Sequence, residues 1–590
     1  MAQGAGFWRT CGVLLVTLAA GWACKRESPR GGGSGVWTPS AGSQGSVSQP
    51  KAEAATKEAV TVVLAYGSEK KSWLTDAIGR FNDKTLRLPS GEQVRVEGQA
   101  VGSGAAVEDL VDGTVKAHAW APASTMYRDV LQRAWTAHQG TLGGKKEILD
   151  EGRSLVLSPV VLAMWKPMAQ ALGWPGKPVG WADVLALSKD PKGWASKQHP
   201  EWGSFKFGHT HPMFSNSGTL SVLAEAYAAL AETRGLTKEA LVKPKVAPFM
   251  ESIEQSIVHY GKSTGFFSEK MLGRGPSFLS AAVLYENLVV DSYTRPEFQT
   301  RDLDLVCVYP KEGTFWIDNP FYVLDAPWSD DAHQKAAAMF RSFLLSPVEQ
   351  ATAMTRFGFR PSDPKIAIAA PLDEAHGVNP KEPQTLLEVP STDVVESALQ
   401  LWTKVKKTVD ISFVFDRSGS MAGEPLKQAK QGALDFLGQL DGRDRVSVLM
   451  FNDKVPDATE PQLLSASRNQ LNDAVSGTFA DGGTALYDAV AKAHDRLAEL
   501  AKQNTKRTYA VVVLTDGKDE HSKLDLEGIK QIVKQPVEVS EAGVRLFTIA
   551  YGAGADSKLL ADLAESGGGA SFKGDATSIR QVYRDLASFF

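Results

Sequence analysis

The chain has 590 residues, of which 43% are hydrophobic, so it is longer than the roughly 250–300 residues that one hydrophobic core usually organises. A single-domain protein is therefore not expected. The 64 basic residues nearly balance 68 acidic ones, which gives no sign of a nucleic-acid-binding surface, and we expect no nucleic-acid partner.

The first 24 residues have the pattern of an export signal. Arg9 provides a positive charge, and the apolar segment from Cys11 to Gly21 follows it. This segment is shorter than the roughly 20 residues that a membrane-spanning helix needs. We therefore predict that residues 1–24 are a signal peptide and that the protein is exported.

The residues at the end of this signal are compatible with two kinds of processing. Small residues at Gly21 and Ala23 suit a peptidase that would release a soluble periplasmic or secreted protein. Alternatively, Gly21-Trp22-Ala23-Cys24 resembles the lipobox of bacterial lipoproteins, although Gly21 stands where that motif has Leu. Residues 25–58 are rich in Gly, Ser, Pro, Gln and Ala, which predicts a flexible spacer. The spacer favours acylation of Cys24, with a lipid anchor as the chain's only contact with the membrane.

Residues 59–404 are expected to form an α/β body. Predicted strands at Thr61–Ala65 and Gln93–Val101 are each followed by a hydroxyl-bearing loop and a helix. Similar loops precede three further predicted helices, the last of which is expected to contain Ala281 to Glu286. The segments Leu155–Trp165 and Leu303–Leu324 are expected to carry the chain between two lobes.

This arrangement resembles the type II periplasmic solute-binding proteins of bacterial ABC importers. The resemblance implies a two-lobed body that binds a small anionic solute in the cleft between its lobes, with hydroxyls and amides at helix N-termini as donors. Carried over to this sequence, the ligand-binding residues would be Ser68, Ser103, Ser124, Ser217 and Tyr285. For each serine alone, helix capping is the alternative; it is the favoured one at Ser277, and it stays open at Ser124.

Residues 405–590 have the alternation of strands and helices that predicts a doubly wound, mainly parallel Rossmann-like sheet. The four predicted strands are Val409–Phe415, Arg445–Phe451, Tyr509–Leu514 and Val544–Tyr551. Amphipathic helices are expected after Pro425 and from Ala485 to Ala501. Ligands of such sheets bind at the carboxyl ends of the strands.

Five oxygen-bearing residues occur at those ends, and we predict that they bind a metal ion: Asp416, Ser418, Ser420, Thr484 and Asp516. Two carboxylates and three hydroxyls, with no His or Cys, suit Mg²⁺ or Mn²⁺ better than Zn²⁺. Water must complete the coordination shell, and a carboxylate of a partner can displace one water. Helix capping and an ordinary turn are the alternative explanation of these residues.

The five residues match the metal-ion-dependent adhesion site of von Willebrand factor type A (VWA) domains. That pattern is Asp-x-Ser-x-Ser, a distant Thr, and an Asp that opens a Thr-Asp-Gly turn. The resemblance implies a domain that binds an acidic residue of a protein partner through Mg²⁺ or Mn²⁺.

Together these features predict an exported, lipid-anchored binding protein of the cell envelope. The alternative is an envelope scaffold whose solute-binding-like body has no small ligand. We find no Walker loop, Gly-x-Ser-x-Gly motif or Cys/His pairing, and we do not expect an enzyme. His209 and His211 have no third ligand at a metal-like spacing, so we expect ordinary hydrogen-bonded or surface histidines.

Overall fold

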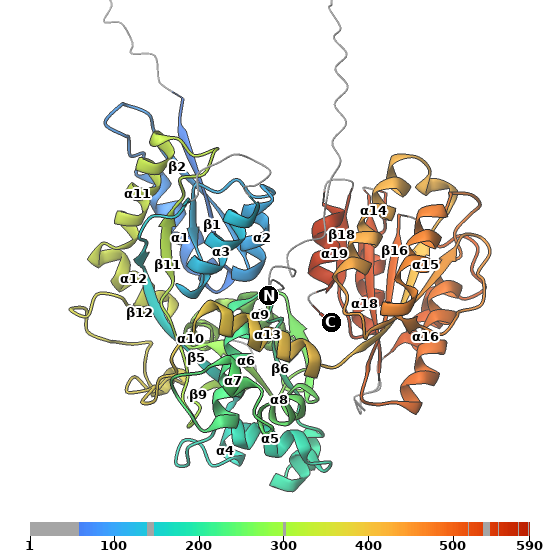
Figure 1. Ribbon diagram of the computed structural model, residues 1–590, viewed down its shortest axis with the longest axis horizontal. Helices are drawn as coiled ribbons and strands as arrows, with labels where there is room; N and C mark the ends of the chain where they lie inside the picture. Colours follow the sequence, from blue (N-terminus) through green and yellow to red (C-terminus); the bar gives the residue numbers. More distant parts are fainter. Residues whose placement is uncertain are drawn as a thin grey trace, which may run out of the picture. The chain divides into compact units, whose positions relative to one another are not determined.

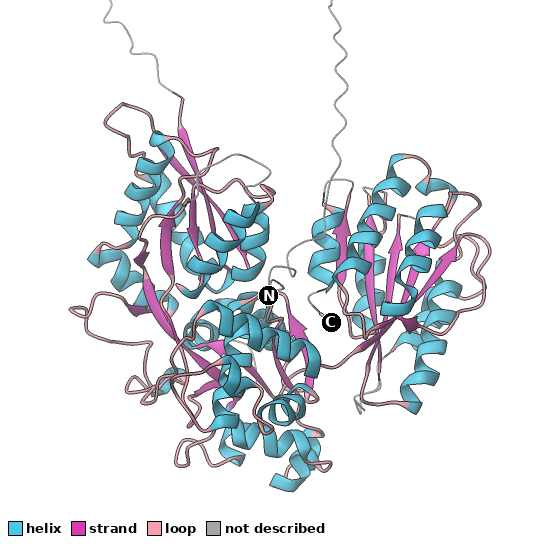
Figure 2. Cartoon of the chain, viewed as in Figure 1, coloured by secondary structure: helices cyan, strands magenta, loops and turns pink. Residues whose placement is uncertain are grey.

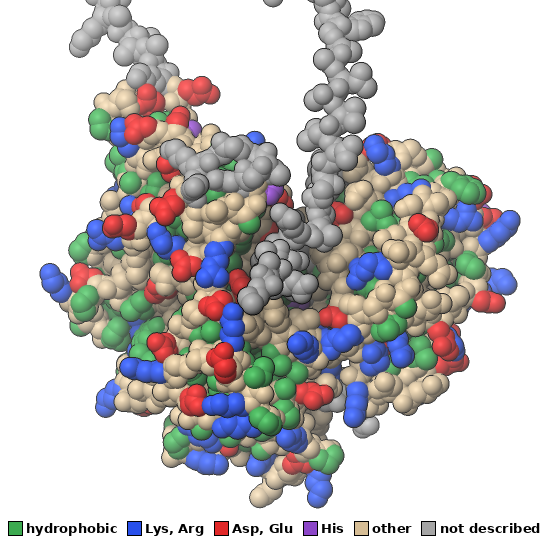
Figure 3. Space-filling view, viewed as in Figure 1, with side chains coloured by type: hydrophobic (Ala, Val, Ile, Leu, Met, Phe, Trp, Pro, Cys, Tyr) green, Lys and Arg blue, Asp and Glu red, His purple; other side chains and the backbone are tan. Residues whose placement is uncertain are grey.

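The computed structural model describes residues 58–138, 147–298, 303–516, 518–534, 543–552, 554–575, 578–587 and 589–590. The predicted signal peptide, Cys24 and all but the last residue of the predicted spacer lie outside these ranges. Strands and helices alternate along the chain (Figure 1, Figure 2). No described helix combines the length and the apolar character needed to span a membrane. Figure 3 shows basic and acidic side chains interspersed over the face that it draws.

The first lobe of the body is built on a five-stranded sheet with the order β2-β1-β3-β11-β4. Strands β1 to β3 are parallel, and β11 runs antiparallel to β3 and β4. Alternate residues of β1 point to opposite faces: Leu64 packs with α1 and α11, whereas Ala65 packs with α2 and α3. The elements are β1 (Val60–Gly67), α1 (Lys71–Asp83), β2 (Val94–Val101), α2 (Ser103–Val111), β3 (Ala119–Ala121), α3 (Met126–His138), β4 (Arg153–Ser154), β11 (Pro320–Val323), α11 (Asp331–Leu344) and α12 (Pro347–Phe357).

The second lobe contains a mixed sheet with the order β10-β5-β8-β6-β7, and β9 and β12 also pair with β5. Its helices and strands enclose the largest hydrophobic core of the body. The strands are β5 (Val156–Trp165), β6 (Phe207–Thr210), β7 (Ile257–Gly261), β8 (Ala281–Tyr285), β9 (Leu305–Val308), β10 (Trp316–Ile317) and β12 (Arg360–Pro361). The helices are α4 (Lys166–Ala171), α5 (Trp181–Lys189), α6 (Asn216–Leu230), α7 (Lys238–Leu241), α8 (Val246–Glu254), α9 (Thr264–Arg274), α10 (Glu286–Thr294) and α13 (Thr392–Val405).

The chain passes between the two lobes where the sequence predicts. Strand β4 belongs to the first sheet and β5, which begins two residues later, to the second. The chain returns to the first lobe between β10 and β11. The prediction of a helix across Ala281 to Glu286 was wrong, because Ala281–Tyr285 is strand β8 and helix α10 begins at Glu286. All five residues of β8 are buried between β5 and β6, and such a short apolar run has no periodicity that distinguishes a strand from a helix.

The C-terminal domain is a doubly wound sheet with the order β15-β14-β13-β16-β17-β18. All its pairings are parallel except that of β14 with β15. Helices α14 and α19 pack on one face, and α16, α17 and α18 on the other. The elements are β13 (Val409–Asp416), α14 (Glu424–Gln439), β14 (Arg445–Phe451), β15 (Gln462–Leu463), α15 (Leu464–Gly477), α16 (Leu486–Gln503), β16 (Thr508–Thr515), α17 (Leu526–Val533), β17 (Val544–Tyr551), α18 (Ser557–Ser566), β18 (Ser571–Gly574) and α19 (Ile579–Ala587).

Strand β13 lies at the centre of this sheet, and every one of its residues is buried. From β13 the chain first adds β14 on one side and later β16 on the other. The strand order therefore reverses between β13 and β16. In open α/β sheets this reversal creates a crevice outside the carboxyl ends of the strands, and Asp416 and Asp516 lie there.

Candidate functional site

The carboxyl ends of β13 and β16 place the two predicted aspartates side by side. The strands are parallel, with Phe415 opposite Leu514, so Asp416 lies next to Thr515. The Thr515 hydroxyl donates a hydrogen bond of 2.6 Å to Asp416 Oδ2, and the Ser418 amide donates one of 2.8 Å to Asp416 Oδ1. Both oxygens of this buried carboxylate are thereby held in fixed directions.

Ser418 and Ser420 connect Asp416 to Asp516, through the Ser418 amide on the Asp416 side and through both hydroxyls on the Asp516 side. Ser418 Oγ lies 3.0 Å from Ser420 Oγ, and Ser420 Oγ donates to Asp516 Oδ1 at 2.9 Å. The alternate spacing of these residues after the strand directs their side chains to one place. Four of the five predicted metal ligands therefore form a continuous chain of hydrogen bonds.

Thr484, the fifth predicted ligand, lies on a loop that makes backbone hydrogen bonds to the serine loop after β13 and to the segment that follows β16. The Gly419 amide donates to the Gly482 carbonyl at 2.9 Å, and the Thr484 carbonyl accepts from the amides of Glu520 and His521 at 2.9 and 3.0 Å. Gly482 has φ +74°, and a Cβ there would lie 2.3 Å from Asp453 Oδ1. A glycine is thus required for the turn that brings Thr484 beside the serine loop.

The protein environment disfavours the negative charge of both carboxylates in this cluster. Burial raises the pKa of Asp416, hydrogen bonds from Thr515 and Ser418 oppose the rise, and the charge of Asp516 adds to it. Burial also raises the pKa of Asp516. The neighbouring guanidinium of Arg417 pairs with Asp481 at 3.0 Å rather than with either carboxylate. Two carboxylates and three hydroxyl-bearing residues thus offer hard oxygen ligands that fit Mg²⁺ or Mn²⁺.

Two of the predicted cleft serines lie at the contact between the lobes of the body. Ser68, at the end of β1, accepts a hydrogen bond of 3.0 Å from the amide of Gly265 in α9. The adjacent residue Thr264 donates to Ser217 Oγ at 2.9 Å. Ser68 and Ser217 are therefore linked through one turn of α9.

Tyr285 also belongs to this region. It ends β8, is fully buried and accepts a hydrogen bond of 2.9 Å from Asn216 Nδ2 in the first turn of α6. Burial raises the pKa of its hydroxyl well above the ordinary value, and the charge of Glu69 adds to the rise. Tyr285 is therefore a neutral hydroxyl that faces the same junction.

Ser103 and Ser124 are bonded within the first lobe. Ser103 Oγ accepts from the Ala123 amide at 3.0 Å, and Ser124 Oγ accepts from the Met126 amide at 3.2 Å. The bond of Ser124 is local and lies at the start of α3. Ser277 is exposed and does not cap the start of a helix, because the element that follows it is strand β8; its hydroxyl donates to the Arg274 carbonyl at 3.4 Å.

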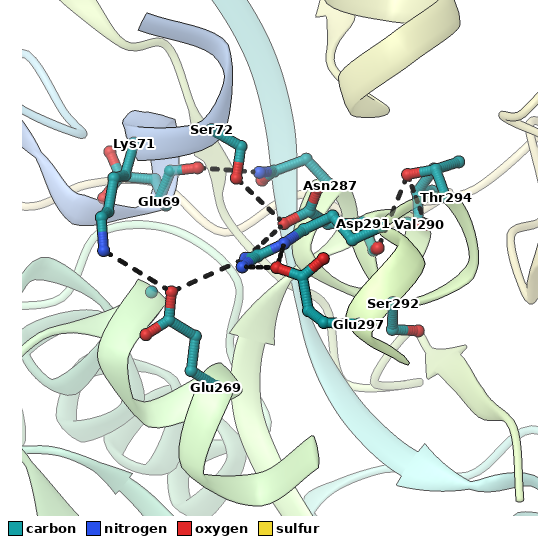
Figure 4. Close-up of polar contacts among 12 residues, drawn as sticks. Glu69, Lys71, Ser72, Glu269, Asn287, Val290, Asp291, Ser292, Thr294 and Glu297 are labelled. Carbon is teal, nitrogen blue, oxygen red and sulfur yellow. Dashed lines mark hydrogen bonds and ion pairs between the residues drawn. The ribbon is translucent and has the colours of Figure 1, made fainter. Parts of the chain in front are cut away.

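Polar contacts of Glu69, Lys71 and Ser72, at and just before the start of α1, with helices α9 and α10 complete the contact between the lobes (Figure 4). Ser72 donates to Asp291 at 3.4 Å, the Asn287 amide donates to the Glu69 carbonyl at 3.2 Å, and Lys71 pairs with Glu269 at 3.8 Å. Two amides at the start of α2, of Gly104 and Ala105, both donate to the Phe214 carbonyl at 3.1 Å.

Sequence reasoning missed Lys70, which lies beside Ser68. Its side chain is fully buried, pairs with Glu69 and donates to Asn319 Oδ1 at 2.8 Å. Burial lowers the pKa of Lys70, and Glu69 opposes this effect. A lysine in the run Ser68-Glu69-Lys70-Lys71 ordinarily indicates a solvated surface, so the sequence contains no signal for this buried cation.

Comparison with protein families assigns both halves of the chain. A family model described as bacterial extracellular solute-binding protein matches residues 62–360. A second model, described as von Willebrand factor type A domain, matches residues 410–585.

Curated relatives match the C-terminal domain. An uncharacterised protein of Synechocystis is 28% identical over 179 residues, which are 30% of this chain and 40% of that protein. The inter-alpha-trypsin inhibitor heavy chain H4 of Sus scrofa is 25% identical over 197 residues, which are 32% of this chain and 20% of that one. The chain therefore matches less than half of the length of either relative.

Solved structures are similar to each half. A periplasmic thiamin binding protein covers 60% of this chain and 98% of its own length, with 12% identity and a TM-score of 0.42. The ferric binding protein from Campylobacter jejuni covers 58% of this chain and 99% of its own, with 12% identity and a TM-score of 0.39. A von Willebrand factor type A protein from Catenulispora acidiphila covers 31% of this chain and 42% of its own length, with 17% identity and a TM-score of 0.26.

Proposed function

Because the chain belongs to the bacterial extracellular solute-binding proteins and carries a von Willebrand factor type A domain at its C-terminal end, we propose that it is an exported binding protein of the cell envelope. Its VWA domain binds Mg²⁺ or Mn²⁺ through Asp416, Ser418, Ser420, Thr484 and Asp516. The bound ion then accepts a carboxylate from a protein partner. The body binds a small anionic solute between its lobes.

The observation that carries this proposal is the chain of hydrogen bonds from Asp416 through Ser418 and Ser420 to Asp516. Two carboxylates balance the charge of a divalent ion, whereas hydroxyl ligands are neutral and leave the ion electrophilic. Mg²⁺ keeps several waters in such sites, because it gives up its hydration shell reluctantly. A carboxylate that replaces one water gains a direct electrostatic contact with the ion.

Water-proton relaxation in the presence of Mn²⁺ tests both parts of the proposal for the VWA domain. We expect the full chain to enhance relaxation by holding Mn²⁺ with exchangeable water, and Asp416→Ala to lose most of this enhancement. Acetate, used as a carboxylate probe, should lower the enhancement because it displaces coordinated water. Asp473→Ala, an exposed aspartate of α15, is the matched control and should behave like the parent. Equal enhancement in the parent and Asp416→Ala would reject the metal site, and no effect of acetate would reject the carboxylate partner.

A scaffold without a small ligand is the second candidate, and one observation favours it. The donors that an anion would use are already paired within the protein, because Gly265 donates to Ser68, and Gly104 and Ala105 donate to the Phe214 carbonyl. A panel of small anions distinguishes the two candidates. A receptor gains thermal stability with one anion and loses that gain in the Ser68→Ala, Ser217→Ala double variant. A scaffold shows no such gain.

We also propose that Cys24 is acylated and tethers the exported chain to the membrane through a flexible spacer. The support comes from the sequence alone, from the small residues before Cys24 and the composition of residues 25–58. Metabolic labelling with a palmitate analogue is expected in the parent and not in Cys24→Ala. Labelling that persists without Cys24 contradicts the tether.

A further inference from the structure

A group of ionisable side chains lies inside the second lobe, apart from both sites described above. His209 belongs to β6, Glu225 lies in the middle of α6, and Glu254 is the last residue of α8. All three residues have 0% of their surface exposed. The nearest ligand atoms of the three side chains all lie within 4.8 Å of one another. A fully buried cluster of two carboxyl groups and an imidazole is costly unless something compensates its charge.

The hydrogen bonds of His209 define which of its nitrogens is available. His209 Nδ1 lies 2.7 Å from the Thr210 carbonyl, which can only accept, so Nδ1 carries a proton. The other nitrogen, Nε2, lies 3.0 Å from Glu254 Oε1. A neutral Nε2 lone pair and a carboxylate oxygen repel each other at this distance, so the contact requires a proton or a cation between the two atoms. A backbone carbonyl that orients one ring nitrogen is also the usual outer partner of a metal-bound histidine.

Glu225 provides the second, independent observation. Both of its carboxyl oxygens are buried and have no hydrogen-bond partner among the described residues. Glu254, by contrast, accepts a hydrogen bond from the hydroxyl of Tyr260 through Oε2. A buried carboxyl group without a partner needs either a proton or a cation, and one oxygen of Glu225 lies within 4.8 Å of the ligand atoms of His209 and Glu254.

We propose that His209, Glu225 and Glu254 form a buried site for a divalent first-row transition metal ion, of which Zn²⁺ is the model. One imidazole nitrogen and two carboxylates suit Zn²⁺, and their two negative charges neutralise it. Zn²⁺ holds such ligands at about 2.0–2.2 Å, and tetrahedral geometry then places them roughly 3.3–3.6 Å from one another. Nε2 of His209 and Oε1 of Glu254, which lie 3.0 Å apart, would separate slightly when the ion binds. The Tyr260 hydroxyl hydrogen-bonds Glu254, and the Thr210 carbonyl hydrogen-bonds His209, so these two groups orient the two ligands from outside the site.

The site connects β6, α6 and α8 with the helix that leads to the VWA domain. Tyr260, which donates to Glu254, packs its ring 5.7 Å from that of Trp402 in α13. His211, two residues after His209, packs 5.0 Å from the same ring. A metal ion in this site therefore stabilises the part of the second lobe on which α13 rests.

Metal analysis of the full chain tests the proposal. Because the cluster is fully buried, the ion must enter during folding, so the protein is expressed in medium with added Zn²⁺ and washed with EDTA before elemental analysis. We expect about one equivalent of Zn²⁺ in the parent, in Asp416→Ala, which removes only the VWA site, and in Glu251→Gln, an exposed glutamate of α8. Glu225→Gln keeps the shape of the side chain and removes its charge. It should weaken Zn²⁺ binding by more than the roughly 10–100-fold that loss of an outer partner costs.

If Glu225→Gln does not fold, X-ray absorption spectroscopy at the zinc edge of the Zn²⁺-loaded parent tests the proposal instead. The expected spectrum has oxygen ligands and one imidazole, which the all-oxygen VWA site cannot supply. A parent without any first-row metal, equal Zn²⁺ in the parent and a folded Glu225→Gln, or a spectrum without imidazole overturns the proposal. The cluster would then be a protonated Glu225 beside Glu254.

Discussion

At the scale of single residues, Asp291 has a carboxylate whose surroundings disfavour its charge. One oxygen accepts from Ser72 and pairs with Arg295 at 3.2 Å, and the other is buried with no hydrogen-bond partner in the described part of the chain. Burial raises the pKa of Asp291 to about 6 from 3.8, although Arg295 and Ser72 oppose the rise. The difference between the two values corresponds to about 3 kcal/mol.

Stability of the body should therefore depend on pH through Asp291. The pKa of Asp291 is higher in the folded state than in the unfolded state, so protonation of Asp291 stabilises the fold. This stabilisation is complete below the unfolded-state pKa of 3.8 and is lost as pH rises through about 6. We expect Asp291→Asn to raise the free energy of unfolding at pH 7 by up to about 3 kcal/mol, and this gain to disappear near pH 4. Urea unfolding followed by tryptophan fluorescence measures it. Glu297→Gln, the exposed partner of the same Arg295, is the control, and a gain that is equal at both pH values contradicts the assignment.

Helix packing in the VWA domain gives a prediction at the scale of elements. Two glycines of α14 differ in their surroundings: a Cβ on Gly432 would lie 2.5 Å from the Tyr583 ring of α19, whereas a Cβ on Gly438 meets nothing within 4 Å. We expect Gly432→Ala to destabilise the domain by about 1–3 kcal/mol through overpacking. Gly438→Ala should instead stabilise it by about 0.5–1 kcal/mol, because alanine is the better helix former. Urea unfolding followed by far-UV circular dichroism compares the two, and equal effects would mean that α19 does not pack on Gly432.

Half of the elements of the VWA domain, namely strands β13, β14, β16 and β17 and helices α14 and α16, could be predicted because their apolar residues follow the period of a buried strand or of an amphipathic helix. Strand β13 is apolar along its whole length since helices cover both faces of the sheet, and α16 keeps its apolar residues on one side. Helices α15, α17, α18 and α19 and the short strands β15 and β18 were not predicted, and only three residues of α15 are buried. Strand β8 was mistaken for a helix because its five residues are all buried and carry no alternation.

The candidate sites differ in how far sequence alone could define them. The adhesion-site residues follow strand ends at fixed spacings, so the motif predicted a cluster that the geometry assembles at Asp416, Ser418, Ser420 and Asp516. The cluster of His209, Glu225 and Glu254 comes from one strand and two helices with no local spacing. Only the packing of α6 and α8 on β6 brings it together, which is why a search for a third ligand near His209 found none.

At the scale of the whole molecule, two separately built domains are joined by a short connection. Only Lys406, Lys407 and Thr408 separate the end of α13 from the start of β13. Trp402 is the last of the 14 tryptophans in the chain, so tryptophan fluorescence reports on the body and not on the VWA domain. Unfolding of the two domains can therefore be followed separately in the intact chain.

The effect of Mg²⁺ on thermal unfolding of the full chain tests the central claim, the divalent-metal site of the VWA domain, most directly. An ion that binds only the folded state adds about 2.7 kcal/mol at a hundredfold excess over Kd. For a domain of this size, that free energy raises the melting temperature by roughly 5–10 °C. We predict that Mg²⁺ shifts the calorimetric transition that tryptophan fluorescence does not detect, and that Asp416→Ala abolishes the shift. If Asp416 were only a helix cap, its replacement would lower stability equally with and without Mg²⁺. A parent chain whose calorimetric trace is the same with and without Mg²⁺ would contradict the metal site.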